Sequence, residues 1–174
     1  MLFQVLLSMS VFAFPVQLSP CNLTTCVGSV CATASTDCGV TRGCICVGGY
    51  VNGTVIPSTT CCCTDWAGHT SNCRTTTGQN SSSFSGEGET ESVILDATQP
   101  LTLQVGGSGA NLSLVANKFA AATGVQLSLW GSAGSRHVAP GRYEGTLSQV
   151  FESLARGVGA RATVSAATKS VKID

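Results

Sequence analysis

The sequence predicts an α+β protein in two parts: a small disulfide-rich N-terminal module, and a small βαββαββ sandwich with two helices on one face of a sheet. All ten cysteines of the 174-residue chain lie between Cys21 and Cys73. From residue 93 onward there is no cysteine, and apolar residues follow first the period of a strand and then that of a helix. The chain is long enough for one average domain or two small ones.

The balance of charges excludes some classes of partner. Charged residues make up only 10% of the chain, with nine basic and nine acidic side chains. A net charge of zero gives no basis for bulk binding to nucleic acid or to an anionic membrane, so we expect neither. Residues 1–92 carry two basic and five acidic residues, and residues 93–174 carry seven and four, which fits two modules.

The N-terminus predicts export. Residues 2–13 are an apolar stretch too short to cross a bilayer, and Val11 and Ala13 are small residues at the −3 and −1 positions of a cleavage site. We therefore expect a signal peptide over residues 1–13 and no stable membrane span after its cleavage. No Lys or Arg follows Met1, which leaves an uncleaved helix or a misplaced start codon as alternatives. The expected location is secreted, periplasmic or in the cell envelope.

Residues 21–75 form the cysteine-rich module. The residues between its cysteines are mostly Gly, Thr, Ser, Val and Asn, which cannot bury enough surface to offset the chain entropy, so disulfides must supply the stability. Ten thiols in so short a run also indicate an oxidising compartment. Five disulfides are expected, with a pairing that the sequence leaves open. The cysteines are Cys21, Cys26, Cys31, Cys38, Cys44, Cys46, Cys61, Cys62, Cys63 and Cys73.

Three of these cysteines are consecutive. Neighbouring residues seldom bridge each other, because their Cα separation and Cβ directions are unfavourable. We expect Cys61, Cys62 and Cys63 to reach back to different earlier cysteines and to pin the loop over 50–60. Metal binding is the alternative, with ligands from the triplet and from Cys44, Cys46, His69 and Cys73. No pair has C-x2-C spacing, so we expect no metal and no cofactor.

Residues 76–92 are expected to form a flexible linker, because they are almost wholly Ser, Thr, Gly and Glu and have no apolar periodicity.

The chain also contains an excess of N-x-Ser/Thr sequons, which would carry N-glycans in a eukaryotic secretory pathway. The asparagines are Asn22, Asn52, Asn80 and Asn111.

The α/β module is predicted over residues 93–174, and its expected elements follow one another in chain order. Apolar residues alternate over 101–105 as a half-buried strand, and Asn111 is a candidate N-cap for a helix that Gly124 ends. A second strand follows over 125–129. A turn at 131–135 then leads to an extended piece from His137 to Glu144, broken at Pro140-Gly141.

The second helix has the clearest start signal. Thr146 and Gln149 have the spacing of a capping box. An apolar face follows, made of Leu147, Val150, Phe151, Leu154 and Ala155, and Gly157 ends the helix. Strands around 162–164 and 171–173 complete the module, with two helices packed on one side of a sheet.

This run resembles the short N-terminal domain shared by secretins and TonB-dependent signalling receptors. Residues 122–127 match the family's "ATG-apolar-x-apolar" helix end, and residues 143–154 resemble its segment built around Gly-x-Thr/Ser-Leu. The Gly and hairpin over 157–173 match its ending. The resemblance covers residues 94–173 and rests on apolar positions and glycines, not on catalytic residues.

The resemblance implies a docking domain in an envelope assembly. Three departures limit it: the segment 102–110 after Pro100-Leu101 is closer to the secretin form, the family's domain normally leads a much longer chain, and the cysteine-rich leader is foreign to most secretins. A free-standing copy would be similar to small subunits that attach to secretin, pilus or conjugation machines.

The chemistry-bearing residues give no case for an enzyme. His69 and His137 are the only histidines, and neither has a recognisable nucleophile beside it. Gly131–Gly134 lacks the G-x-S-x-G arrangement, and Gly106–Gly109 lacks both phosphate-loop spacings. We therefore expect no catalytic activity.

The sequence predicts that the protein binds another protein. Basic residues of the C-terminal module could form an edge that meets an acidic partner, and short sheets also invite strand addition. They are Arg136, Arg142, Arg161, Lys169 and Lys172. The first hypothesis is an exported, non-catalytic docking subunit of a secretin, pilus or secretion assembly. The alternative is a secreted eukaryotic, fungal-type cysteine-rich effector or adhesin that is N-glycosylated.

Overall fold

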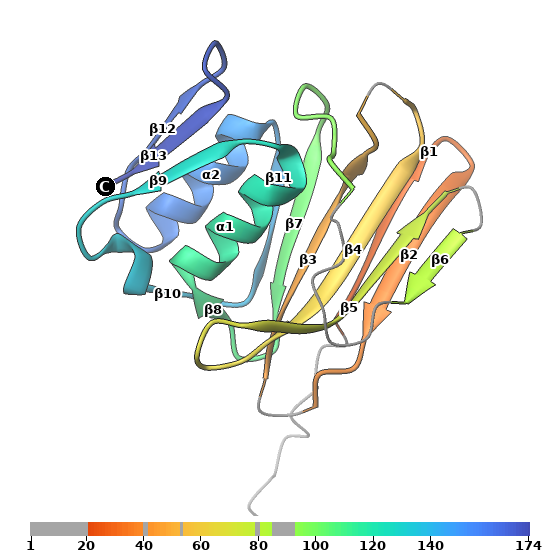
Figure 1. The fold of residues 1–174 in the computed structure, drawn as a ribbon, viewed down its shortest axis with the longest axis horizontal. Helices are drawn as coiled ribbons and strands as arrows, with labels where there is room; N and C mark the ends of the chain where they lie inside the picture. The colour runs from red at the N-terminus through yellow and green to blue at the C-terminus, as the bar shows by residue number, and fades with distance from the viewer. Residues whose placement is uncertain (1–20, 40–41, 53, 79–80, 85–92) are drawn as a thin grey trace, which may run out of the picture.

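The structure, a computed structural model, describes residues 21–39, 42–52, 54–78, 81–84 and 93–174 (Figure 1). The expected signal peptide and Asn80 lie outside the described residues. The α+β, disulfide-rich class is confirmed, because the described residues contain two α-helices, mostly antiparallel sheets and five disulfides in the N-terminal half. The helices are α1 (Leu112–Thr123) and α2 (Leu147–Gly157).

The two helices form a layer between two sheets (Figure 1). On one side lies a three-stranded sheet in the order β12-β13-β9, formed by β12 (Ala162–Ser165), β13 (Ser170–Ile173) and β9 (Gln126–Leu129). On the other lies a six-stranded sheet in the order β11-β7-β3-β4-β5-β6. Its strands are β11 (Gly141–Gly145), β7 (Leu101–Gly106), β3 (Gly43–Tyr50), β4 (Pro57–Thr64), β5 (Thr70–Thr77) and β6 (Ser81–Phe84).

This arrangement differs in one respect from the expected sandwich. The predicted strands and helices are all present, but the strands are divided between two sheets, so the helices are covered on both sides. Two short strands, β8 (Ala110–Asn111) and β10 (His137–Val138), pair separately. Alternation along a single strand shows which of its faces is apolar, but it does not show which sheet the strand joins.

The six-stranded sheet joins the cysteine-rich segment to the C-terminal segment. Strand β3 pairs antiparallel with β4 on one side and with β7 on the other, and Val47 lies opposite Leu103. Leu95 provides a second link between the two segments. Its backbone N–H donates to Ala122 O at 2.6 Å, and it forms an isolated antiparallel β-bridge with Val51. Part of the predicted linker also lies in this sheet, because β5 ends at Thr77 and β6 pairs with it. The division into modules stays a prediction, but the sheet runs across it.

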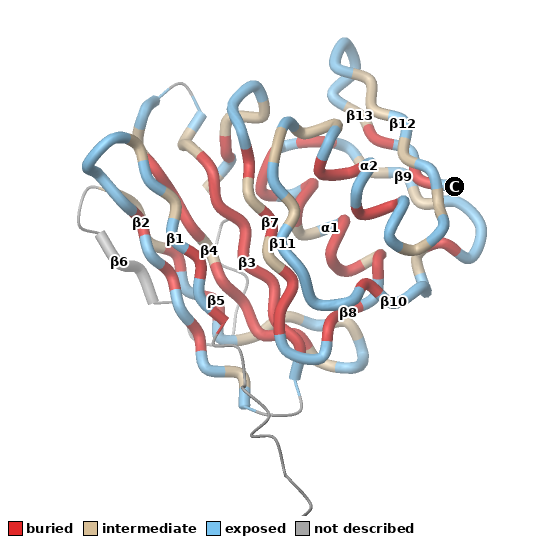
Figure 2. The backbone as a smooth tube through the Cα atoms, turned by 180° about the vertical axis from the view of Figure 1, so that it is seen from behind, coloured by how far each residue is buried: buried red, intermediate tan, exposed pale blue. Residues whose placement is uncertain are grey.

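Strand β3 is buried on both faces (Figure 2). Ile45 and Val47 belong to the core that holds the helices, whereas Cys44 and Cys46 belong to a second cluster on the opposite face. That opposite face is covered by the hairpin of β1 (Cys21–Val27) and β2 (Val30–Thr36). The hairpin approaches so closely that a Cβ at Gly48 would collide with Thr25 Oγ1.

All ten cysteines form disulfides. The pairs are Cys21–Cys44, Cys26–Cys31, Cys38–Cys63, Cys46–Cys61 and Cys62–Cys73. Two of the three consecutive cysteines reach back as expected, but Cys62 bonds forward to Cys73, so that part of the expectation is wrong. The reason is the pleat: successive residues of β4 point to opposite faces, and Cys62 therefore faces away from the hairpin, toward β5. A bulge in β5, with Asn72 at a φ of 50°, brings Cys73 to it.

Two of the helix signals read from the sequence are confirmed, the capping box of α2 and the glycine that ends α1. Thr146 and Gln149 form both hydrogen bonds of the capping box, and Gly124 ends α1 in the left-handed region at a φ of 67°. Asn111 occupies the N-cap position of α1, but its side chain makes no capping hydrogen bond.

Candidate interaction surfaces

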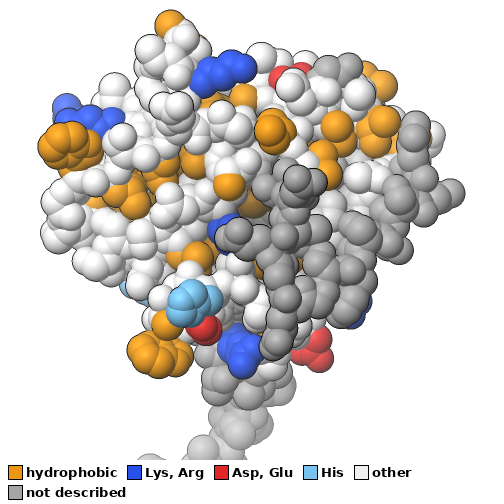
Figure 3. All heavy atoms as spheres, viewed as in Figure 1, with side chains coloured by type: hydrophobic (Ala, Val, Ile, Leu, Met, Phe, Trp, Pro, Cys, Tyr) orange, Lys and Arg blue, Asp and Glu red, His pale blue; other side chains and the backbone are white. Residues whose placement is uncertain are grey.

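The turn between β4 and β5 presents the most exposed aromatic side chain of the described residues. Trp66 is 95% exposed. Asp65 holds the turn closed: its Oδ1 accepts the backbone N–H of His69 at 2.8 Å, and its Oδ2 lies 3.2 Å from His69 Nδ1. Its own backbone N–H donates to His69 O at 3.0 Å. In Figure 3 a hydrophobic side chain stands beside a histidine at the lower left, where Figure 1 places this turn.

Disulfides fix the base of this turn. Cys63, two residues before Asp65, is bonded to Cys38, and Cys62 is bonded to Cys73 of β5. The strands on both sides of the turn are therefore tied covalently to each other and to the segment that follows β2. A turn held in this way can present Trp66 without first being ordered by a partner, which lowers the entropic cost of binding.

The hydrogen bond from the His69 backbone N–H, together with the His69 side chain, lowers the pKa of Asp65 below its ordinary value of 3.8. A carboxylate with a lowered pKa contributes to the closed turn above pH 3.8 and loses that contribution as the pH falls through its lowered value. We therefore expect the amide resonance of His69 to move at a pH below 3.8 in a titration from about pH 5 to about pH 2. An Asp65→Asn variant should show no such step. A midpoint at or above 3.8 would contradict the prediction.

The five basic residues proposed as a partner-binding edge do not share one strand. Arg142 lies on β11, where it pairs with Glu144. Arg136 follows a short 3-10 turn and donates from Nη1 to the backbone oxygens of Val158 at 2.9 Å and Gly159 at 2.7 Å, at the end of α2. Two of the five are therefore engaged in local contacts away from the three-stranded sheet.

The other three lie around the three-stranded sheet. Lys172 is on β13, Lys169 is in the turn before it, and Arg161 directly precedes β12. The Nζ atom of Lys172 lies 5.3 Å from the ring centroid of Trp130. The sequence had no local signal for this grouping, because it depends on the pairing of β13 with β9 and β12.

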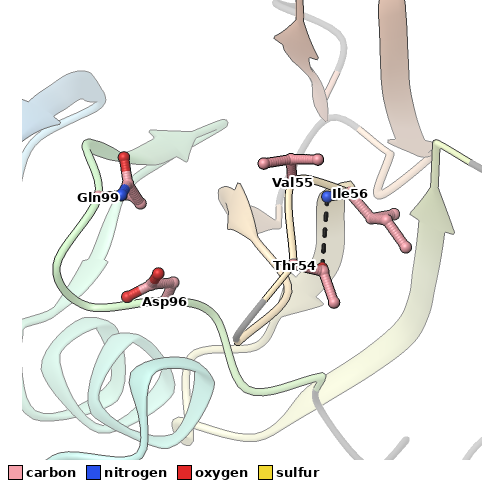
Figure 4. A pocket seen from close by; sticks show the side chains of 5 residues that line it. All are labelled: Thr54, Val55, Ile56, Asp96 and Gln99. Atoms are coloured by element: carbon pink, nitrogen blue, oxygen red, sulfur yellow. Dashed lines mark hydrogen bonds between the residues drawn. The ribbon is translucent and has the colours of Figure 1, made fainter.

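A shallow hollow lies between the β3–β4 turn and the segment before β7 (Figure 4). It is lined by Thr54, Val55, Ile56, Asp96 and Gln99. Asp96 accepts hydrogen bonds from the hydroxyl and backbone N–H of Thr98, which lower its pKa. The hollow therefore offers a carboxylate already bound by its neighbour, and its lining includes no nucleophile beside a base.

The remaining predicted residues are on the surface. Asn22, Asn52 and Asn111 are exposed, as are His69 and His137. Within the described ranges, no cluster of three or more His, Cys, Asp or Glu side chains is placed to hold a metal ion. None of the described helices is long and apolar enough to cross a membrane.

Comparison with known proteins gave no match to a family model, to a curated protein or to a solved structure. Trp66 and Trp130 are the surface features that the sequence reasoning did not select. A signal existed for Trp66, because Asp65-Trp66-Ala67-Gly68 places a large aromatic residue inside a sequence typical of a turn.

Proposed function

We propose that the chain is an exported, non-catalytic protein-binding protein that contacts its partner through the turn carrying Trp66. The observation that carries the proposal is the 95% exposure of Trp66 on a turn with a disulfide-locked base. Trp is enriched among the residues that dominate binding energy at protein interfaces. Exposing an indole to water is unfavourable, and a partner's pocket would remove that cost.

Two further features support an exported docking subunit. The five disulfides fit an oxidising compartment. The resemblance of residues 94–173 to the secretin and TonB short N-terminal domain favours the cell envelope, with a component of a secretin, pilus or secretion assembly as the partner. In this proposal the sheet shared by the two segments holds the Trp66 turn at a fixed position relative to the docking domain.

A second candidate function is a secreted eukaryotic effector or adhesin. The exposure of the sequon asparagines Asn22, Asn52 and Asn111 favours it, because buried asparagines could not carry glycans in the folded protein. The mass of the protein isolated from its source, before and after enzymatic removal of N-glycans, distinguishes the two. A mass decrease supports the effector or adhesin, and an unchanged mass supports the envelope subunit.

The test of the proposed binding surface uses a Trp66→Ala variant of the full chain. The wild-type protein, immobilised under oxidising conditions, should retain one protein from the envelope or secreted fraction, with saturable binding. We expect Trp66→Ala to weaken that binding by at least about 2 kcal/mol, or about thirtyfold in Kd. Trp130→Ala is the matched control, because Trp130 is also exposed but directly follows β9 of the three-stranded sheet, away from the β4–β5 turn. Equal binding by wild type and Trp66→Ala would contradict the proposal.

A further inference from the structure

The solvent-facing side of the three-stranded sheet is a polar platform. Residues alternate between the two faces of each strand, and Val171 and Ile173 of β13 are buried against the helices. The intervening residues point outward. The same alternation places Leu127 and Leu129 of β9 against the core and leaves Ser128 exposed.

The pairing of the strands sets these outward residues in three rows of three. Lys172 is at the centre, opposite Ser128 on β9 and Thr163 on β12. The backbone bonds of Trp130 to Ile173 and of Asp174 to Arg161 continue the pairing past the strand ends. The rows are Gln126, Ser170 and Ser165; then Ser128, Lys172 and Thr163; then Trp130, Asp174 and Arg161. All nine residues are exposed or half-exposed.

One corner of the platform combines an aromatic ring with a cation. Trp130 is 60% exposed, and Lys172 Nζ lies 5.3 Å from its ring centroid. Lys172 Nζ also forms an ion pair with Asp174 Oδ2 at 3.4 Å. The platform itself contains two basic side chains, Lys172 and Arg161, and Lys169 lies beside it, so the basic groups outnumber the single acidic side chain, Asp174.

We propose that this platform binds an acidic polysaccharide, a sugar polymer that carries carboxylates. The indole offers a flat apolar surface for the C–H face of a sugar ring, and Lys172 and Arg161 offer charge complementarity to a uronate. The neutral hydroxyl and amide groups around them can hydrogen-bond to sugar hydroxyls. Neighbouring strands are about 4.8 Å apart, so the platform is about 10 Å wide and suits a short stretch of an extended chain.

The composition of the platform favours this occupant over the other polyanions. Nucleic acid places a phosphate on every nucleotide and is bound through many Lys and Arg contacts, whereas only two cations stand in the nine-residue platform. Protein interfaces are centred on a buried apolar anchor, whereas here the central residue is Lys172 and the aromatic residue is at a corner. Five of the nine side chains are uncharged hydrogen-bonding groups: Gln126, Ser128, Thr163, Ser165 and Ser170.

Binding is tested with the full disulfide-bonded chain and three soluble polymers. Polygalacturonate is the probe, its fully methyl-esterified form removes only the negative charge, and poly-L-glutamate presents carboxylates without sugars. Calorimetric titration should show binding to polygalacturonate and at least about tenfold weaker binding to each of the others. If poly-L-glutamate bound as tightly as polygalacturonate, charge attraction alone would explain the binding and the proposal would be overturned. An absence of binding to polygalacturonate would also overturn it.

Two variants locate the site. Trp130→Ala should lower the affinity for polygalacturonate about tenfold, as expected for the loss of one aromatic contact, and Trp130→Phe should restore part of it. The matched control is Trp66→Ala, which should bind as wild type does. Because Trp130 is exposed, an unchanged circular dichroism spectrum is expected and would show that the fold is intact. Lower affinity for polygalacturonate in Trp66→Ala, or unchanged affinity in Trp130→Ala, would overturn the assignment of the site to Trp130. The protein-binding proposal at Trp66 is tested separately.

Discussion

Replacing Phe119 by alanine is expected to lower the free energy of unfolding by about 3–5 kcal/mol, the largest effect we expect from a single substitution in this protein. Phe119 is fully buried in α1, and its ring centroid lies 5.0 Å from that of Phe151 in α2. Because the helices are enclosed by sheets on both sides, the surrounding side chains have little freedom to collapse into the cavity that the substitution leaves.

Denaturant unfolding with the disulfides intact measures this effect. The control is Val55→Ala, because Val55 is 79% exposed in the β3–β4 turn and its truncation should change stability by no more than about 0.5 kcal/mol. A loss below about 1 kcal/mol for Phe119→Ala would contradict the close packing of the helix layer. The Phe151→Ala variant should show a loss of similar size, since its ring is the tilted partner of Phe119, at 57° between the ring planes.

Removing the Cys46–Cys61 disulfide by a double substitution to alanine is expected to destabilise the protein by at least about 3 kcal/mol. The bond closes a separation of 15 residues, and the chain-entropy estimate for such a loop gives that magnitude. Both cysteines are fully buried between the hairpin and the six-stranded sheet, so the lost packing adds to the effect. The loss of stability should extend beyond the cysteine-rich segment to the C-terminal segment, because β3 pairs directly with β7.

Hydrogen exchange of the β7 amides tests this spread, and the matched control is the disulfide Cys26–Cys31. That bond also joins directly opposed residues of two antiparallel strands, but it is exposed and closes a separation of only 5 residues. Its removal should cost about 2 kcal/mol by the same estimate, so exchange in β7 should quicken less than in the Cys46–Cys61 variant. Unchanged β7 exchange in the Cys46–Cys61 variant would contradict the coupling of the two segments.

The C-terminal elements could be predicted because their signals are local. The capping box of α2, the glycine that ends α1 and the alternation along β7 each depend on residues close together in the chain. The platform on the three-stranded sheet could not be predicted in the same way. Lys172, Trp130 and Arg161 come together only through the parallel pairing of β13 with β9 and its antiparallel pairing with β12.

The strands of the cysteine-rich segment were missed for a different reason. Strand β3 reads Gly-Cys-Ile-Cys-Val-Gly-Gly-Tyr, with no alternation of apolar and polar residues, because it is buried on both faces. Strands β1 and β2 are rich in Thr and Ala, and their inward residues are small. Without alternation, neither the face of a strand nor its register can be read from the sequence.

Composition and local patterns were enough to predict the α+β class, the need for disulfides in the first half and the order of elements in the second. Those features follow from composition and from contacts within one turn or one strand. The folded chain was needed to show which cysteines bond, that β3 joins the two segments, and that the helices lie between two sheets. These features depend on strand pairing, which links residues far apart in the chain, and on the pleat, which then determines which side chains meet on each face.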